Sequence, residues 1–318
     1  MIINILVSIA GFIVLIKSAD FFVDGASSFA KNLKIPAAVI GLTIVSFGTS
    51  APELAISFNS HLSGNYDMLY GNVIGSSISN ILVILGVAVL IVPFNIKHDI
   101  IKKEIPILLF VTLGFSVLFL DSLFDFAPTN ALSRADGIVM ILFFSIFIYY
   151  LITLLVNCKD KSIYENPEHK MLRSVIMIIL GLAGIVISSN LIVDNAAEFA
   201  ASIGISQKII AVTIISIGTS LPELVTTVTA AKKGENDIAI GNIVGSNIFN
   251  ICIVLGLPVV ILGEAATVAF NTTDILFMLM SAGVLWVFSA TNRKLKRYEG
   301  AILVAIYCAY GAYVLIQQ

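Results

Sequence analysis

The chain has 318 residues, of which 58% are hydrophobic and only 12% are charged, and its mean hydropathy is +1.02. This composition excludes a soluble globular protein and predicts an integral membrane protein in contact with the lipid bilayer. The net charge of −2 and basic residues scattered over short loops exclude a nucleic-acid-binding protein, and three cysteines without a CxxC pair indicate neither a disulfide framework nor a zinc site.

Ten apolar segments follow one another along the chain, and most approach the ~20 residues that cross a bilayer as a helix. We therefore expect an all-α membrane protein with ten transmembrane helices. Several segments are longer than a straight crossing needs, which predicts tilted or interrupted helices. The segments cover residues 2–30, 36–60, 68–92, 104–121, 136–156, 173–200, 206–231, 238–262, 272–290 and 299–316.

Lysine and arginine gather in alternate loops between these segments. One set of loops contains only Arg134 and Lys208. The opposite set contains Lys31, Lys34, Lys97, Lys102, Lys103, Lys159, Lys161, Lys170, Arg173, Lys232, Lys233, Arg293, Lys294, Lys296 and Arg297. Because cytoplasmic loops carry an excess of basic residues, we expect a multi-pass protein of the cell membrane with both termini extracellular.

The two halves of the chain repeat each other at a constant offset of 170 residues: SADFFVDGASSFA begins at Ser18, and SSNLIVDNAAEFA begins at Ser188. The repeat predicts a first five-helix unit (1–156), a short cytoplasmic linker (157–172) and a second five-helix unit (173–318). An odd number of crossings inserts the second unit upside down, so we expect inverted-topology repeats. Transporters of this kind bind their substrate near the bilayer midplane, on interrupted helices.

Each half carries one acidic motif inside an apolar segment, GTSAPEL from Gly48 and GTSLPEL from Gly218. The proline of each motif interrupts its helix and frees carbonyl groups of the preceding turn, around Ser46, Phe47 and Gly48 in the first half. Glu53 lies eight residues from His61 at the outer boundary, or ~12 Å at helical rise, near the membrane centre. Neither motif contains a basic residue, so a bound cation or protons must neutralise Glu53 and Glu223.

The residues around the two glutamates offer oxygen ligands of a kind that suits hard ions such as Ca²⁺ and Na⁺ rather than zinc or copper. Thr49, Ser50, Thr219 and Ser220 add hydroxyl groups from the acidic motifs. The segments GNVIGSSISN from Gly71 and GNIVGSNIFN from Gly241 add Ser76, Asn80, Ser246 and Asn250. Their glycines, Gly71, Gly75, Gly241 and Gly245, are expected to allow close helix packing.

The motif GTS-x-PEL followed by GN-x-x-GS-x-x-x-N, present twice, resembles the Na⁺/Ca²⁺ exchanger family of the cation/Ca²⁺ antiporter superfamily, in its compact prokaryotic form with two α-repeats. The resemblance covers the whole chain and implies a secondary active antiporter that works by alternating access, with ions bound between the second, third, seventh and eighth helices. It also implies that the long first and sixth helices slide against the rest. The transported ions would be Ca²⁺ and Na⁺, without a further cofactor or an obligatory protein partner.

The resemblance also assigns ligands position by position. It implies a Ca²⁺ site formed by Glu53 and Glu223 with the carbonyls of Thr49 and Thr219, and a central ring completed by Asn80 and Asn250. The implied Na⁺ sites use Ser50, Ser76 and the Ser216 carbonyl on one side, and Ser220, Ser246 and the Ser46 carbonyl on the other. Some prokaryotic relatives and the K⁺-dependent exchangers carry Asp where this chain has Asn250, so the resemblance does not lead us to expect K⁺ co-transport.

Three other functions fit parts of the pattern. A Ca²⁺/H⁺ antiporter would use the same two glutamates as proton carriers and is the main alternative. A passive cation channel would also display oxygens, but proline-broken helices in inverted halves favour alternating access. An intramembrane hydrolase could use Ser50 or Ser220, yet no histidine or lysine base lies in either motif, so we do not expect an enzyme.

Overall fold

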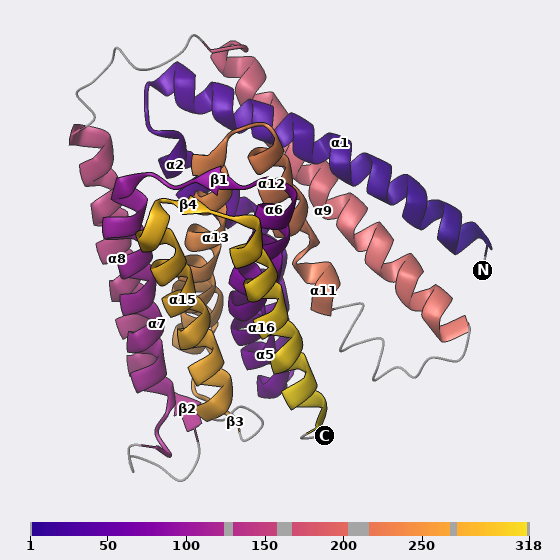
Figure 1. Ribbon diagram of the computed structural model, residues 1–318. Coiled ribbons are helices and arrows are strands. Elements are labelled where there is room, and N and C mark those ends of the chain that lie inside the picture. Colours follow the sequence, from indigo (N-terminus) through magenta and orange to yellow (C-terminus); the bar gives the residue numbers. More distant parts are fainter. Residues whose placement is uncertain (1, 124–129, 158–166, 203–215, 268–271, 317–318) are drawn as a thin grey trace.

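The computed structural model describes residues 2–123, 130–157, 167–202, 216–267 and 272–316. Each apolar segment predicted above coincides with one or more helices, as far as it lies within these ranges (Figure 1). The helical elements of the first half, with π-helical turns labelled η, are α1 (Ile2–Leu33), α2 (Ala37–Ile40), η1 (Gly41–Val45), α3 (Ser46–Thr49), α4 (Ala51–Leu62), α5 (Tyr66–Ser79), η2 (Asn80–Leu85), α6 (Gly86–Ile91), η3 (Ile100–Glu104), α7 (Ile105–Phe119) and α8 (Arg134–Asn157).

In its described residues the second half repeats this order of helices, without a π-helical turn equivalent to η3. Its first helix has 32 residues, the same length as α1. The helical elements are α9 (Met171–Ser202), α11 (Ser216–Thr219), α12 (Leu221–Lys232), α13 (Asn236–Phe249), η5 (Asn250–Leu255), α14 (Gly256–Leu262), α15 (Thr272–Asn292) and α16 (Arg297–Ile316).

The number of helices able to cross a membrane is six within the described residues, or seven if one bent pair counts as a single span. The bent pair joins Ala37–Thr49 to Ala51–Leu62 at an angle of 45°. These helices make the chain a multi-pass membrane protein, whereas the ten predicted crossings stay a prediction. The six spans are Leu6–Leu33, Tyr66–Ile91, Arg134–Val156, Met171–Ala200, Asn236–Leu262 and Thr272–Thr291.

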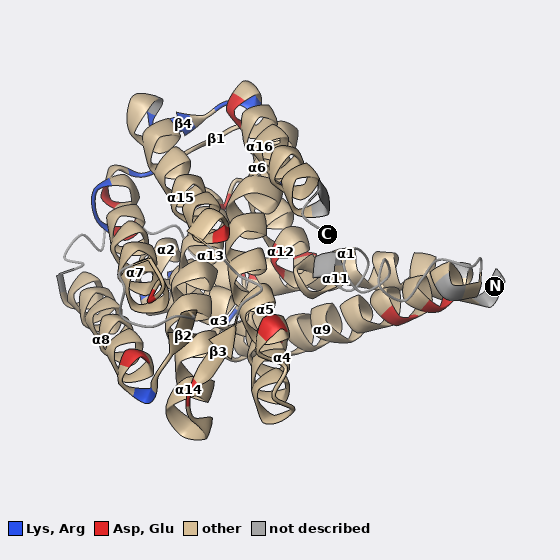
Figure 2. Cartoon of the chain, turned by 90° about the horizontal axis from the view of Figure 1, so that it is seen from below, with Lys and Arg blue, Asp and Glu red and all other residues tan. Residues whose placement is uncertain are grey.

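The long helices α1 and α9 lie side by side and run in opposite directions (Figure 1). Gly184 packs against Ser18 and Gly181 packs against Phe22, so residue numbers fall along α9 as they rise along α1. At the far end of the pair, the Asn4 amide donates a hydrogen bond of 3.2 Å to Glu198, whose part of α9 carries the acidic residues coloured red beside the N-terminus in Figure 2. The first helices of the two halves are therefore antiparallel.

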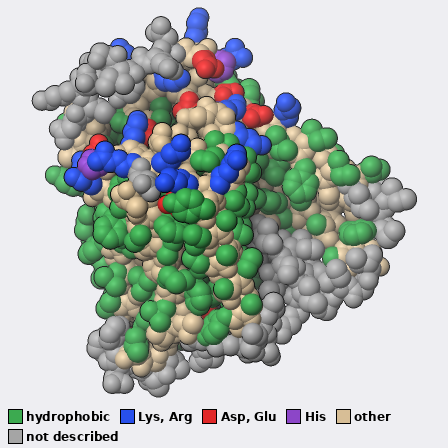
Figure 3. Space-filling view, in the orientation of Figure 1, with side chains coloured by type: hydrophobic (Ala, Val, Ile, Leu, Met, Phe, Trp, Pro, Cys, Tyr) green, Lys and Arg blue, Asp and Glu red, His purple; other side chains and the backbone are tan. Residues whose placement is uncertain are grey.

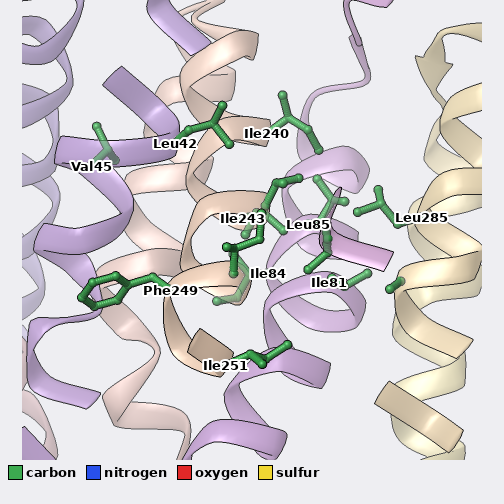
Figure 4. Close-up of a cluster of buried hydrophobic side chains, with 14 of the residues drawn as sticks. Leu42, Val45, Ile81, Ile84, Leu85, Ile240, Ile243, Phe249, Ile251 and Leu285 are labelled. Atoms are coloured by element: carbon green, nitrogen blue, oxygen red, sulfur yellow. The ribbon is translucent and has the colours of Figure 1, made fainter. Parts of the chain in front are cut away.

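The centre of the molecule is built around α13, in which every side chain from Ile238 to Phe249 is buried. Gly241 lies against the backbone of Ala38 and Gly41, and Gly245 lies against Leu42, which confirms the predicted close packing for this pair of glycines. The equivalent partners of Gly71 and Gly75 would be residues 208–212, which lie outside the described residues. Figure 4 shows the apolar side chains that fill the space around α13, among them Leu42, Val45, Ile81, Ile84, Leu85, Ile240, Ile243, Phe249, Ile251 and Leu285.

Two short antiparallel ribbons mark the opposite ends of the helices (Figure 1). The strand β1 (Phe94–Asn95) pairs with β4 (Lys294–Leu295) at one end, and β2 (Asn130–Leu132) pairs with β3 (Ala265–Thr267) at the other. Lysine and arginine side chains gather over the β1–β4 end (Figure 3), as the alternation of basic loops predicts. We call this end the basic end.

Candidate cation-binding site

The two acidic motifs form the same helix break in both halves. Ser50 separates α3 from α4 with φ −88° and ψ 8°, and Ser220 separates α11 from α12 with φ −92° and ψ 5°. A proline follows in the first turn of α4 and of α12, where its missing N–H removes no helical hydrogen bond within the new helix. Glu53 and Glu223 lie in these first turns, where the positive end of the helix dipole stabilises a carboxylate.

Both glutamates are buried, with exposed fractions of 1% for Glu53 and 0% for Glu223. The Ser50 hydroxyl donates a hydrogen bond of 3.0 Å to Oε1 of Glu223, so the break in one half touches the acid of the other. Within the described ranges, Oε2 of each glutamate has no hydrogen-bond partner, and neither carboxylate forms an ion pair with a basic side chain. The structure therefore brings together two buried acids without a protein counter-charge.

Two asparagines on the neighbouring helices form hydrogen bonds with the turns that follow the breaks. The Asn72 amide donates hydrogen bonds of 2.9 Å to the Glu53 carbonyl and to the Ser57 hydroxyl. The Asn242 amide donates to the Glu223 carbonyl at 3.5 Å and to the Thr227 hydroxyl at 2.9 Å. Sequence analysis did not select Asn72 and Asn242 as site residues, although both occupy the position after the glycine of GN-x-x-GS.

The Asn242 side chain also links the two halves. Its Oδ1 accepts a hydrogen bond of 3.2 Å from the Thr49 hydroxyl. The amide nitrogen of Asn242 donates within its own half, to Glu223 and Thr227, so this one side chain holds the Thr49 hydroxyl next to the turn that carries Glu223. The Thr49 hydroxyl thus lies beside the turn that carries Glu223, and the role of Thr49 as a cation ligand stays a prediction.

The Ser46 carbonyl is not free, in contrast to the expectation from the proline. It accepts hydrogen bonds from the Ser50 backbone N–H at 3.0 Å and from the Ser246 hydroxyl at 3.4 Å. The expectation is wrong for Ser46, because Pro52 removes the donor for the carbonyl four residues earlier, which belongs to Gly48, another of the three residues expected. Ser246 and Ser46 nevertheless meet across the two halves, and their role as cation ligands stays a prediction.

Asn80 and Asn250 each begin a π-helical turn, η2 and η5, and both are buried. The Asn80 amide donates a hydrogen bond of 3.3 Å to Oδ1 of Asn247 on α13. Within the described residues, Oδ1 of Asn80 and both polar atoms of Asn250 have no partner. Single π-helical turns are frequent at functional sites, and here each one carries a predicted ligand.

The other predicted residues lie in the same elements. Ser76 is buried on α5, and Ser220 is buried in the second break. Thr219 is half-buried at the end of α11, and α11 begins at Ser216, whose side chain lies outside the described residues.

The chemistry of the assembled groups suits a hard cation as substrate. The cluster consists of two carboxylates, hydroxyls, amide oxygens and backbone carbonyls. Within the described part of the chain, no group of three or more His, Cys, Asp or Glu side chains could hold a metal ion. Oxygen ligands with limited charge are typical of sites for Ca²⁺ and related ions, whereas nitrogen and sulfur ligands select transition metals.

Comparisons with known proteins point to one family over nearly the whole chain. A family model described as sodium/calcium exchanger protein matches residues 3–153 and 173–316. The chain is 32% identical to the sodium/calcium exchanger MaX1 of Methanosarcina acetivorans, over 97% of each protein, and 38% identical to the inner membrane protein YrbG of Escherichia coli (strain K12), over 86% of this chain and 85% of that protein. A solved structure of the sodium-calcium exchanger NCX_Mj is similar with a TM-score of 0.83 at 29% identity and covers 98% of both chains.

Proposed function

Because the chain belongs to the sodium/calcium exchanger family, whose members are cation/Ca²⁺ antiporters of the membrane, we propose that it exchanges Na⁺ for Ca²⁺ through a site centred on Glu53 and Glu223. The observation that carries the proposal is the pair of buried glutamates with free carboxylate oxygens and no basic partner among the described residues. An uncompensated charge at the membrane centre costs several kcal/mol, so these acids need a cation.

The charge of the site explains why the two ions exclude each other. One Ca²⁺ neutralises two carboxylates, and Na⁺ ions spread over the same oxygens do so as well. The Ser50 hydroxyl, which contacts Glu223, and the free amide oxygen of Asn80 offer neutral ligands beside the acids. Since Ca²⁺ and Na⁺ use the same carboxylates, binding of one ion displaces the other. This competition couples their transport in opposite directions.

Alternating access follows from the symmetry of the two halves. We infer ten crossings in two inverted five-helix units, residues 1–156 and 173–318. The antiparallel pair of α1 and α9, and equal breaks at Ser50 and Ser220, support this arrangement. Inverted units can exchange conformations, which opens the midplane site first to one side and then to the other.

The long helices α1 and α9 are the elements that we propose to slide. At the basic end, Lys233 forms ion pairs with Asp24 of α1 at 2.7 Å and with Asp20 at 3.7 Å. The Ser27 hydroxyl of α1 donates a short hydrogen bond to Glu235. These contacts tie α1 to the α12–α13 turn and would have to open when the site faces this end.

The orientation in the membrane follows from the distribution of charge. Basic side chains gather at the β1–β4 end (Figure 3), whereas the chain reaches its C-terminus at the opposite end (Figure 1). We therefore propose that the basic end faces the cytoplasm and that both termini are extracellular, in the cell membrane.

The alternative that uses the same residues is Ca²⁺/H⁺ exchange, because protons can also neutralise the two glutamates. Uptake of ⁴⁵Ca²⁺ into proteoliposomes separates the two. Vesicles loaded with Na⁺, with K⁺ or with acid are compared, and the Glu53→Gln protein serves as the negative control. Uptake driven by the Na⁺ gradient and absent from Glu53→Gln supports the proposal. Uptake driven only by the proton gradient contradicts it and favours the alternative.

A further inference from the structure

The cation cluster departs from the symmetry of the two halves at one position. Asn247, on α13, corresponds to Ser77 on α5, since the two positions differ by the repeat offset of 170 residues. Asn247 accepts a hydrogen bond of 3.3 Å from Asn80 across the boundary between the halves. The equivalent contact would join Ser77 to Asn250, yet the Ser77 hydroxyl and both polar atoms of Asn250 lack a partner among the described residues.

All four side chains are buried, so water from the surface does not replace the missing hydrogen bonds. The exposed fractions are 1% for Asn80 and Asn247, 0% for Asn250 and 2% for Ser77. A buried polar atom without a partner costs free energy, so the hydrogen bond between Asn80 and Asn247 stabilises this pair, whereas Nδ2 of Asn247 has no partner among the described residues. The serine hydroxyl is also shorter than an asparagine amide, which explains why one cross-contact forms and the other does not.

In the arrangement observed, this hydrogen bond leaves the oxygen end of the Asn80 amide available to a cation. An asparagine offers one oxygen acceptor and one NH₂ donor, and a cation accepts only the oxygen as ligand. Because Nδ2 of Asn80 is occupied by Asn247, its Oδ1 is the atom that stays free. No neighbour among the described residues fixes Asn250 in this way.

We propose that Asn247 is a positioning residue that holds Asn80 with its oxygen directed to the transported cation, so that Asn80 and Asn250 are inequivalent ligands. The proposal rests on the proposed function, since it concerns the same site. Asn80 then supplies a constant oxygen ligand. Asn250 can turn its amide and adapt to the ion or water molecule that is bound.

The test is a double-mutant cycle between positions 247 and 80, measured by calorimetric Ca²⁺ binding to the purified protein. Asn247→Leu keeps the side-chain shape but removes the acceptor, and it should weaken Ca²⁺ binding about tenfold, the size expected for loss of an oriented ligand. In the Asn80→Asp protein both terminal atoms of residue 80 are oxygens, so its orientation no longer matters. There, Asn247→Leu should change Ca²⁺ affinity less than about twofold.

A purely structural role for Asn247 gives a different result, because Asn247→Leu would then weaken binding equally with Asn or Asp at position 80. That result, or unchanged Ca²⁺ affinity of Asn247→Leu itself, overturns the proposal. Ser77→Ala is the matched control: its hydroxyl has no partner among the described residues, so Ca²⁺ affinity should be unchanged.

The same variants separate this proposal from the proposed function. In transport assays, Asn247→Leu should raise the half-saturating Ca²⁺ concentration and leave the maximal rate within about twofold of the parent. Calorimetry reports Ca²⁺ binding whatever the coupling ion. A protein that binds Ca²⁺ with the predicted cycle but takes it up only along a proton gradient therefore contradicts Na⁺ coupling and supports the role of Asn247.

Discussion

The hydroxyl of Ser50 donates a hydrogen bond of 3.0 Å to the carboxylate of Glu223, although the two residues belong to different halves of the chain. Ser50 lies at the break that precedes Glu53, and Glu223 lies just after the equivalent break at Ser220. The first half thus contributes a hydrogen-bond donor to the acid of the second half. A cation bound to Glu223 is consequently sensitive to any movement of the first half.

Replacement of Ser50 by Ala should raise the half-saturating Ca²⁺ concentration for uptake about tenfold, because a hydrogen bond to a charged group contributes about 1.5–3 kcal/mol. Initial rates of ⁴⁵Ca²⁺ uptake over a range of Ca²⁺ concentrations measure this change. Ser63→Ala is the control, since the Ser63 hydroxyl bonds only to carbonyls of its own helix end. Equal half-saturating concentrations for Ser50→Ala and Ser63→Ala would contradict the role of the Ser50–Glu223 contact.

Glu53→Gln and Glu223→Gln should fold normally in the absence of Ca²⁺, because a neutral amide removes a buried charge that is unpaired within the described residues. Ca²⁺ should raise the melting temperature of the parent protein, since a ligand at ~100 times its Kd stabilises the folded state by about 2.7 kcal/mol. Neither variant should show this increase. Thermal unfolding with and without Ca²⁺ makes the measurement, with Glu198→Gln, an exposed position on α9, as the control. A Ca²⁺-dependent increase in either site variant would argue against the assignment.

Gly245→Ala should destabilise the protein by about 1–3 kcal/mol, the usual result of overpacking. A Cβ atom at this position would lie 2.6 Å from the Ser46 hydroxyl oxygen and 2.8 Å from the Leu42 carbonyl oxygen, and backbone cannot move aside. Chemical or thermal unfolding compares it with Gly283→Ala, where a Cβ meets nothing within 4 Å in the described structure. Equal stability of Gly245→Ala and Gly283→Ala would contradict the close packing of α13 against η1.

Cross-linking α1 to the α12–α13 turn should stop exchange if α1 moves during transport. In a protein without Cys158, Cys252 and Cys308, the pair Ser27→Cys and Glu235→Cys is joined by a short reducible cross-linker, and Ca²⁺ uptake is measured before and after reduction. Uptake should be lost on cross-linking and return on reduction, because the contact of Ser27 with Glu235 would be locked.

The control for this experiment lies at the same end of the molecule. Asn95 and Lys294 face each other in the β1–β4 ribbon, which joins two loops outside the α1–α9 pair. Cross-linked cysteines at these positions should leave uptake unchanged. Full uptake by the cross-linked Ser27–Glu235 pair would exclude a sliding motion of α1 at this contact.

The sequence predicted those features of the site that depend on repetition and on single residues. The offset of 170 residues placed Glu53 and Glu223 in equivalent positions, and the prolines placed a break before each of them. The structure confirms the break, because a proline disrupts a helix whatever surrounds it, and both acids are buried. The ligand set as a whole remains a prediction.

Other features could not be predicted because they depend on contacts between helices. Asn72 and Asn242 share a helical face with predicted ligands, so their position alone did not show that they bond to the glutamate carbonyls. Asn247 was missed because the repeat has serine at the equivalent position. The Ser46 carbonyl shows the limit of the proline argument, since Pro52 removes the donor for Gly48, while the Ser50 N–H and the Ser246 hydroxyl of the other half still donate to Ser46.

The central claim is that Ca²⁺ and Na⁺ compete for the carboxylates of Glu53 and Glu223. Calorimetric titration of the purified protein with Ca²⁺, repeated at increasing Na⁺ with K⁺ as the balancing cation, tests it directly. The account predicts Ca²⁺ binding that weakens progressively as Na⁺ rises and that is absent from Glu223→Gln at every Na⁺ concentration. Ca²⁺ binding that is independent of Na⁺, or that persists in Glu223→Gln, would contradict it.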